Sequence, residues 1–170
     1  MIIELESVGK SPRSIRVALD PGEIDLDGEA VRLAGEAILD GEMRRTADGI
    51  ELIAVLRHEA LLDCTRCLES VSKTFEVPFR DIFLEPAAFV PNTEAELSGD
   101  DLDKSIAESG RVDIADVMRE QILLAVPEQI LCRDDCKGLC PKCGADLNLI
   151  DCNCADGEVD PRWTALKNII

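Results

Sequence analysis

The chain has 170 residues, which is enough for one domain with a hydrophobic core, or for one domain and a small module. Its formal net charge is −17, and since residues 127–170 hold eight acidic and five basic residues, −14 of this charge falls on residues 1–126. A chain this acidic, with one Trp, no Tyr and four Phe, repels phosphate and offers few rings for stacking bases, so general binding to naked nucleic acid is disfavoured.

The same charge favours a basic protein as partner, although it could also serve solubility alone. No apolar run approaches the ~20 residues that a membrane span needs. The opening MIIELESVGK has an acidic residue where a secretory signal has basic ones, and no apolar region follows it. We therefore expect a cytoplasmic protein without membrane contact. In a reducing cytosol, its eight cysteines indicate metal binding or redox chemistry rather than disulfides.

Alternating apolar residues predict strands in the first half of the chain. Short runs at 2–6 and 14–19 predict two of these strands. From 31 to 43 the apolar residues fall mainly on odd positions, and from 50 to 62 they fall on even positions, with the turn signal TADG at 46–49 between them. A period of two is expected for strands with one wet face.

A third alternating run follows from 71 to 83, and Pro78 within it indicates an edge strand or a bulge. We expect this run and the two before it to form an antiparallel meander. The acidic stretch at 92–110 then has the composition of a solvated linker. The predicted inner face of the third run consists of Val71, Phe75, Val77, Phe79 and Phe83.

The stretch DIADVMREQILLAV at 113–126 has helical spacing. Asp113 is the predicted N-cap and Pro127 ends the helix. We expect this helix to pack on the meander through a broad apolar face. A second, shorter helix is predicted at 160–170. The packing face of the first helix is predicted to contain Ile114, Val117, Met118, Gln121, Ile122, Leu124 and Ala125.

Six of the eight cysteines lie within residues 132–154. Cys140 and Cys143 form a CxxC with Pro and Gly, whose turn aims backbone N–H groups at the thiolates and lets both sulfurs reach one ion. Zinc suits a four-thiolate site because it has no redox chemistry of its own, and an iron–sulfur cluster is the alternative. We therefore predict zinc, with Cys140 and Cys143 as the surest ligands.

The other ligands are drawn from Cys132, Cys136, Cys152 and Cys154, and the sequence does not choose among them. One four-thiolate site would leave two of these thiols over, whereas a two-metal cluster would share all six. Cys132, Cys136 and Cys140 are spaced four apart and would share a face if this segment were helical.

Cys64 and Cys67 form a second CxxC, in CTRC, between the second and third predicted strands. A hairpin must turn there, which is a knuckle position and not the strand-to-helix position of a thioredoxin-like redox pair. These thiols could complete a second metal site with thiols left over from the C-terminal group. Alternatively, they are free thiols or pack locally.

The sequence names no catalytic residue. His58, the only histidine, shares a strand face with Leu56 and Ala60, which indicates a partly buried, hydrogen-bonded side chain rather than a ligand or base. We find no phosphate loop, dinucleotide fingerprint or nucleophile elbow. An all-thiolate zinc site is closed, whereas catalytic zinc keeps an open position. We therefore expect no enzymatic activity.

Five segments together carry a resemblance to a known family: CTRCL (64–68), QILLAVP (121–127), CKGLCPKCGADLN (136–148), CNC (152–154) and DPRWTALKNI (160–169). In these segments, their order and their spacing, the chain resembles the YceD-like family of large ribosomal RNA subunit accumulation proteins. The resemblance implies a role in accumulating or processing large-subunit ribosomal RNA, and a metal that is structural. It implies no molecular mechanism.

The expected fold is α+β: an antiparallel β-meander or a partly closed barrel packed by one helix, with a small Cys-rich zinc module and a terminal helix. The expected divisions are a β-rich body at 1–91, the acidic linker at 92–110, the packing helix at 111–127, and the zinc module with its terminal helix at 128–170.

The leading hypothesis is a non-enzymatic ribosome biogenesis factor that binds a basic ribosomal protein or large-subunit assembly factor and contacts ribosomal RNA weakly or indirectly. The rival is a zinc–thiolate redox sensor, in which oxidation ejects the metal. An enzyme that modifies or cleaves RNA is a third, less favoured alternative. The predicted contact residues are Glu36, Asp40, Glu51 and Glu59, with the linker near Asp100 to Asp103; Arg133, Lys137 and Lys142 are the basic residues of the module.

Overall fold

The computed structural model describes residues 1–26, 30–47, 49–85 and 103–154. The chain divides into two compact units, each built from two segments. Unit 1 comprises Met1–Leu62 and Ser70–Glu128, and unit 2 comprises Asp63–Glu69 and Gln129–Ile170. The predicted terminal helix, and the part of the predicted linker up to residue 102, lie outside the described residues.

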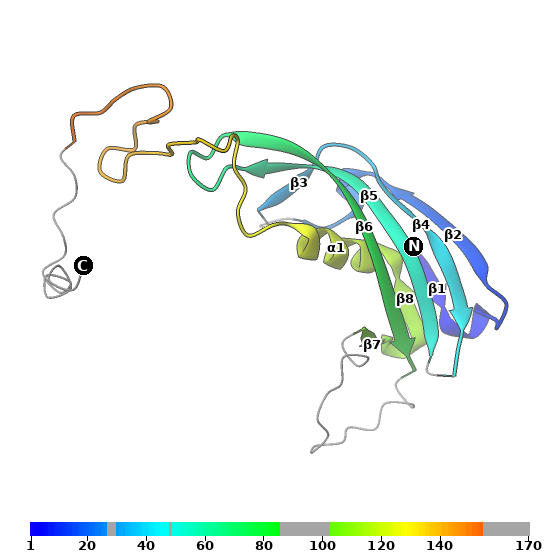
Figure 1. The fold of residues 1–170 in the computed structure, drawn as a ribbon. Coiled ribbons are helices and arrows are strands. Elements are labelled where there is room, and N and C mark those ends of the chain that lie inside the picture. The colour runs from blue at the N-terminus through cyan, green and yellow to red at the C-terminus, as the bar shows by residue number, and fades with distance from the viewer. Residues whose placement is uncertain (27–29, 48, 86–102, 155–170) are drawn as a thin grey trace, which may run out of the picture. The chain divides into compact units, whose positions relative to one another are not determined.

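The described chain is mostly β-sheet with one α-helix, in agreement with the predicted α+β class (Figure 1). In the part of the chain that the structure describes, short 3-10 turns lie at Leu5–Ser7, Pro21–Glu23 and Glu108–Gly110. The strands are β1 (Ile2–Glu4), β2 (Arg13–Leu19), β3 (Val31–Leu33), β4 (Ala37–Arg45), β5 (Ile50–Asp63), β6 (Ser70–Leu84), β7 (Lys104–Ile106) and β8 (Arg111–Asp113), and the helix is α1 (Ile114–Ala125).

The main sheet has the strand order β2-β4-β5-β6-β7, with β3 also paired to β5. β4 pairs antiparallel with both β2 and β5, and β6 runs opposite to β5, so the predicted meander β4-β5-β6 is present (Figure 1). No pairing among the described strands joins β2 to β7, so this sheet is open and the barrel alternative is wrong. β1 and β8 form a separate antiparallel pair.

The run predicted as one strand over 31–43 forms two strands, β3 and β4. Leu33 pairs with Ala60 and Ile38 pairs with Arg57, so the chain between the two pairings is two residues longer on the β3–β4 side than on β5. Because side chains alternate with a period of two, an insertion of two residues keeps the odd positions of both strands on the buried face. The alternation therefore survives the interruption.

Pro78 lies in β6 where this strand is an edge, as predicted. Within the described residues, β7 pairs with β6 only at Ile82–Leu84, so the missing N–H of Pro78 interrupts no pairing on that side. The predicted inner face of β6 is half-buried up to Phe79, and at its end both Ile82 and Phe83 are buried.

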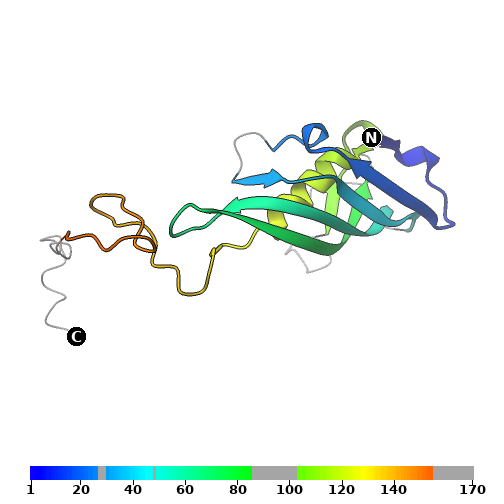
Figure 2. The same cartoon turned by 90° about the horizontal axis from the view of Figure 1, so that it is seen from above.

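Helix α1 packs against β6 and β8 on one face of the curved sheet, as expected (Figures 1 and 2). Asp113 is its N-cap, and the Asp113 side chain accepts a hydrogen bond from the N–H of Ala115 at 3.0 Å. Leu124 is 78% exposed, so its predicted place on the packing face is wrong. Two residues along a helix turn the side chain to the opposite side, and Ile122 already faces the core. The buried residues of α1 are Ile114, Val117, Met118 and Ile122.

Part of the predicted linker is regular structure, because β7 pairs parallel with the end of β6 and a 3-10 turn follows it. The three residues of β7 are too few to show a period, so the sequence did not indicate this strand. In the part of the chain that the structure covers, no helix has both the length and the apolar character needed to cross a membrane.

Candidate metal centre

Unit 2 joins the turn between β5 and β6 to the segment that follows α1. The N–H and hydroxyl of Thr65 donate to the carbonyl oxygen of Ile130 at 2.7 and 2.9 Å. The N–H of Leu139 donates to the carbonyl oxygen of Arg66 at 3.0 Å, and the Arg66 guanidinium donates to the carbonyl oxygen of Cys136 at 2.8 Å. These bonds hold the CTRC turn against the C-terminal cysteine segment.

The eight cysteines fall into two groups of four, which we call the first and second tetrads. Within each tetrad the four Sγ atoms all lie within 4.8 Å of one another. All eight thiols are free. The first tetrad consists of Cys64, Cys67, Cys132 and Cys136, and the second of Cys140, Cys143, Cys152 and Cys154.

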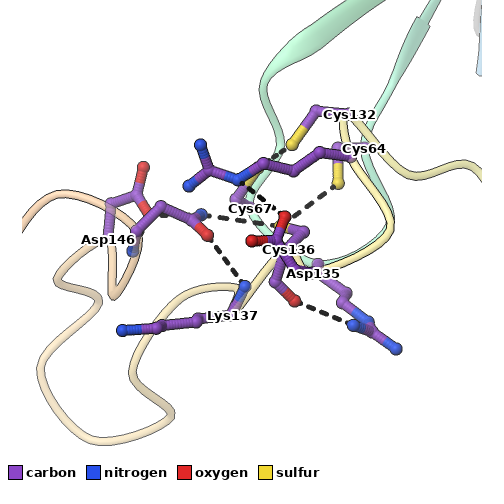
Figure 3. A network of polar contacts seen from close by, with 10 residues as sticks. Cys64, Cys67, Cys132, Asp135, Cys136, Lys137 and Asp146 are labelled. Carbon is purple, nitrogen blue, oxygen red and sulfur yellow. Dashed lines mark hydrogen bonds and ion pairs between the residues drawn. The ribbon is translucent and has the colours of Figure 1, made fainter.

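The sulfur spacing in the first tetrad fits a tetrahedral metal site. The Sγ atoms of Cys64 and Cys136 are 3.8 Å apart, and those of Cys67 and Cys132 are 3.6 Å apart (Figure 3). Four sulfurs bound to one zinc at about 2.3 Å would lie roughly 3.8 Å from one another. A disulfide would bring two sulfurs to about 2.05 Å. The donor set and its spacing therefore fit an ion held by four thiolates.

The CTRC and CPKC turns have the same backbone geometry. In CTRC the N–H of Leu68 donates to the carbonyl oxygen of Cys64 at 2.9 Å, and in CPKC the N–H of Gly144 donates to that of Cys140 at the same distance. The residue after each second cysteine has a positive φ, 64° at Leu68 and 72° at Gly144. Both turns are therefore knuckles of one kind, as the sequence predicted for their CxxC motifs.

Backbone N–H groups in each knuckle point at the first thiol. Burial raises the pKa of the Cys64 thiol, but hydrogen bonds from the N–H groups of Arg66 and Cys67 outweigh it and lower the pKa to about 6. At Cys140, the N–H groups of Cys143 and Lys142 lower the pKa of the thiol to about 6. Hydrogen bonds to a thiolate stabilise its charged form, which is the form that binds a metal.

Asn148 braces the first tetrad from the segment after the second knuckle. Its side-chain oxygen accepts a hydrogen bond from the N–H of Lys137 at 2.8 Å, and its side-chain nitrogen lies 3.5 Å from the Sγ atom of Cys136 (Figure 3). The Asp146 carboxylate accepts hydrogen bonds from the backbone N–H and from the side-chain nitrogen of Asn148, and so orients the side-chain amide of Asn148. Such outer contacts fix the orientation of metal ligands. We did not identify Asn148 or Arg66 from the sequence, since neither carries a spacing signal.

Unit 2 has almost no apolar core. Among its described residues, the buried ones are Cys64, Cys67, Cys136, Gly138 and Cys140. Cysteine sulfurs thus stand where a larger domain would have packed Leu and Ile side chains. A small module without such a core depends on a cross-link or a metal for its stability.

The structure divides the six C-terminal thiols between the two tetrads, a division that the sequence left open. Cys132 and Cys136 lie with the CTRC thiols, and the remaining four lie with the CPKC knuckle. The segment from Cys132 to Cys140 is not helical, so the shared helical face considered for Cys132, Cys136 and Cys140 does not form. A cluster sharing all six thiols is not the arrangement found in the structure.

His58 is not part of either tetrad. It is buried on the inner face of β5, and its ring stacks on Phe75 with the ring centroids 5.0 Å apart. Neither ring nitrogen has a hydrogen-bond partner among the described residues, so the expected hydrogen bond is absent. The face predicted for His58 is correct, because Leu56 and Ala60 are buried beside it.

Curated relatives include proteins with and without a described role. An uncharacterized protein of Mycobacterium tuberculosis is 24% identical over 174 residues, which cover 100% of this chain and 81% of that protein. The uncharacterized protein YlbN of Bacillus subtilis is 34% identical over 113 residues, which cover 66% of this chain and 61% of that protein. No solved structure matches the chain.

Two curated plant relatives have a descriptive name. The large ribosomal RNA subunit accumulation protein YCED homolog 1, chloroplastic, of Arabidopsis thaliana is 26% identical over 180 residues, which cover 94% of this chain and 54% of that protein. The family model described as large ribosomal RNA subunit accumulation protein YceD matches residues 54–170, a range that contains both tetrads. The chain therefore belongs to the YceD family of large ribosomal RNA subunit accumulation proteins.

Proposed function

We propose that this protein is a non-enzymatic factor that supports the accumulation of large-subunit ribosomal RNA in the cytoplasm, and that it acts through a basic protein partner of ribosome assembly. Family membership supports the role in accumulation. The observation that carries the choice of partner is the charge of −17. Affinity for nucleic acid comes mainly from Lys and Arg that displace counterions, so this surface favours a basic protein over naked RNA.

Two of the predicted contact carboxylates are poorly suited to a basic partner. Glu51 is only 4% exposed and accepts hydrogen bonds from Arg44 and Arg80 at 2.6 and 2.8 Å, so its predicted role as a contact residue is wrong. Asp40 lies 3.6 Å from both Arg16 and Arg57. Arginines on the same face of the sheet thus offset the charge of both carboxylates.

Acidic residues also lie close together near α1. Burial, together with the charges of Glu120 and Asp103, raises the pKa of Asp81 to about 6, because nearby carboxylates disfavour a further negative charge. Asp116 and Glu120 are exposed on α1 and line a cavity of about 340 Å³ between the helix, β7 and β8, to which Asp113 and Arg111 also contribute. This acidic edge of unit 1 is the surface that we propose for a Lys- or Arg-rich partner segment.

Affinity capture of the full chain from cells, with and without RNase, tests the proposed partner. We expect ribosomal or assembly proteins of basic character to survive RNase treatment and to dissociate as salt is raised, because exposed charges are screened over about 8 Å at physiological ionic strength. Loss of every ribosomal component after RNase would show instead that RNA is the direct partner, and Arg133, Lys137 and Lys142 would then be the residues to replace.

Two variants with the same net charge test the proposed surface. Asp116→Lys with Glu120→Lys reverses the acidic edge, and Glu42→Lys with Glu59→Lys reverses two exposed carboxylates of the sheet. We expect the first pair to lower the association rate about tenfold or more and the second pair to lower it much less. Equal losses would mean that overall charge, and not this edge, attracts the partner.

The proposal also assigns a structural zinc ion to each tetrad. It rests on the 3.6 and 3.8 Å sulfur separations in the first tetrad and on the lack of an apolar core in unit 2. Structural zinc contributes on the order of 10–16 kcal/mol of apparent binding energy in small modules, enough to fold such a unit. The ion would hold the thiolates together and would carry out no chemistry.

Elemental analysis of protein purified without added metal tests this assignment. We expect two zinc ions per chain, and one ion in each of the single variants Cys64→Ser and Cys140→Ser, since each disrupts one tetrad. Iron in place of zinc would support the cluster alternative. Metal-free protein in which unit 2 resists proteolysis would refute the structural role.

A further inference from the structure

The two tetrads differ in how far solvent reaches them. Three of the four cysteines in the first tetrad are buried, and Cys132 is the half-buried one. In the second tetrad only Cys140 is buried, Cys152 is half-buried, and both Cys143 and Cys154 are exposed. A dissolved oxidant can therefore collide directly with two thiolates of the second tetrad, whereas most of the first tetrad is shielded.

Groups next to the sulfur atoms increase the expected difference in reactivity between the two tetrads. The Asn148 amide lies 3.5 Å from the sulfur of Cys136, and a hydrogen bond to a thiolate withdraws electron density that would otherwise attack an oxidant. Gly138 packs closely on the CTRC turn, since a Cβ atom added there would lie 3.0 Å from the carbonyl oxygen of Arg66. The first tetrad is thus both less accessible and held by contacts from two parts of the chain.

We propose that the second tetrad is an oxidation-sensitive site, at which hydroperoxides convert Cys143 and Cys154 into a disulfide and so release the metal, while the first tetrad stays reduced and keeps its metal. The inference goes beyond the proposed role in ribosome biogenesis and rests on the zinc assigned to the second tetrad. The Sγ atoms of Cys143 and Cys154 lie within 4.8 Å of each other, so they can bond after a small movement.

The reaction needs a peroxide and two thiolates. The thiolate of Cys143 or Cys154 attacks one peroxide oxygen, the O–O bond breaks, hydroxide leaves and a sulfenic acid forms. The other thiolate then attacks the sulfenic sulfur, the S–S bond forms, the S–O bond breaks and a second hydroxide leaves. In total, two thiolates and one hydrogen peroxide give one disulfide and two hydroxides. The site then retains Cys140 and Cys152, too few thiolates for a closed four-coordinate site.

The test uses the full chain after its zinc content has been measured. Hydrogen peroxide is added in steps near neutral pH, released zinc is followed with a coloured chelator, and free thiols are alkylated for peptide mass spectrometry. We expect about one ion per chain to be released, a Cys143–Cys154 disulfide, and oxidation of the first tetrad at least about tenfold more slowly. Dithiothreitol and zinc should restore the starting state.

Several outcomes would overturn the proposal: release of both ions together, equal oxidation of both tetrads, or a disulfide in which Cys143 pairs with Cys140. Two double variants provide a matched control. Cys143→Ser with Cys154→Ser should hold one ion that survives peroxide, and Cys64→Ser with Cys132→Ser should hold one ion that peroxide releases. If the purified chain lacks zinc, the zinc assignment fails, but the alkylation pattern still decides the order of oxidation.

Discussion

Leu68 and Gly144 occupy equivalent positions, each directly after the second cysteine of a CxxC knuckle. Their φ angles are 64° and 72°, and each N–H donates to the carbonyl oxygen of the knuckle's first cysteine at 2.9 Å. The left-handed region costs about 1–2 kcal/mol for a residue with a Cβ atom, whereas glycine enters it freely. Leu68 is 65% exposed, so burial of its side chain offsets little of this strain.

Exchanging the residue types at these two positions should therefore have opposite effects. We expect Leu68→Gly to stabilise the first knuckle by about 0.5–1 kcal/mol, and Gly144→Leu to destabilise the second by about 1–2 kcal/mol. Competition with a zinc chelator measures both, since a looser knuckle gives up its ion at a lower chelator concentration. If Leu68→Gly weakens zinc retention, the Leu68 side chain contributes packing that outweighs its strain.

Gly138 occupies a tighter place than Gly144. Its φ is +77°, and a Cβ atom added there would lie 3.0 Å from the carbonyl oxygen of Arg66, whereas nothing lies within 4 Å of a Cβ added at Gly144. Gly138→Ala should thus cost about 2–3 kcal/mol and release metal from the first tetrad, and Gly144→Ala should cost only about 1 kcal/mol. Zinc content and protease resistance of unit 2 measure the difference. Equal effects of the two variants would mean that only the backbone angle matters.

Long alternating or periodic segments were predictable from sequence because one physical pattern covers many residues. β5 has buried residues at its even positions, all apolar except His58, and α1 begins at a capping aspartate. β7 has only three residues, and its pairing with β6 defines it as a strand. A pairing between distant segments leaves no pattern in the local sequence. Leu124 was misplaced because apolar character alone does not decide which side of a helix faces the core.

The two CxxC pairs of the metal site were predictable from the sequence. The assignment of the other four cysteines to those pairs was not. A CxxC motif places two thiols on one ion whatever surrounds it, so Cys140 with Cys143, and Cys64 with Cys67, were recognisable pairs. Which further cysteines join each pair depends on how the β5–β6 turn meets the C-terminal segment, over more than 60 residues of sequence. Glu51 was misjudged for a similar reason, because an alternating pattern treats every carboxylate as solvated.

Glu51 should contribute to stability through its two arginines. Hydrogen bonds from Arg80 and Arg44 hold the pKa of Glu51 below its ordinary value. A lowered folded pKa means that this stabilisation is present above the unfolded pKa of about 4.3, and is lost as the pH falls through the folded value. We expect Glu51→Gln to lower the free energy of unfolding at pH 7 by about 1–2 kcal/mol, less than for a fully buried pair because both arginines are half in solvent.

Glu76→Gln is the matched control for this prediction. Glu76 also pairs with an arginine, Arg57 at 3.1 Å, but its side chain is 64% exposed. Exposed pairs contribute little, so we expect a change below about 0.5 kcal/mol. Urea unfolding followed by circular dichroism at neutral and acid pH measures both variants. A loss at Glu51 that does not shrink in acid would show that shape, and not charge, is what the site requires.

Asp81 should destabilise the folded chain at neutral pH. Burial, together with the charges of Glu120 and Asp103, raises the pKa of Asp81 to about 6, above the value of about 3.9 for an exposed aspartate. The folded state therefore binds the proton more tightly than the unfolded state does. It follows that this carboxyl favours folding below about pH 4, and that the advantage is lost as the pH rises through about 6.

Asp81→Asn removes the charge and keeps the shape, so we expect it to stabilise the chain at pH 7 by about 1–2 kcal/mol, a figure reduced for the half-exposed position of this side chain. Urea unfolding should show the gain at pH 7 and almost none near pH 3, where the aspartic acid is neutral in both the folded and the unfolded state. Burial also lowers the pKa of His58, whose protonation destabilises the fold in acid, but both proteins share it and the comparison cancels it. Glu120→Gln should in turn lower the pKa of Asp81 in an NMR titration, because one of the two charges that raise it is gone. If Asp81→Asn instead weakens the fold at pH 7, the carboxylate makes a favourable contact that outweighs its burial.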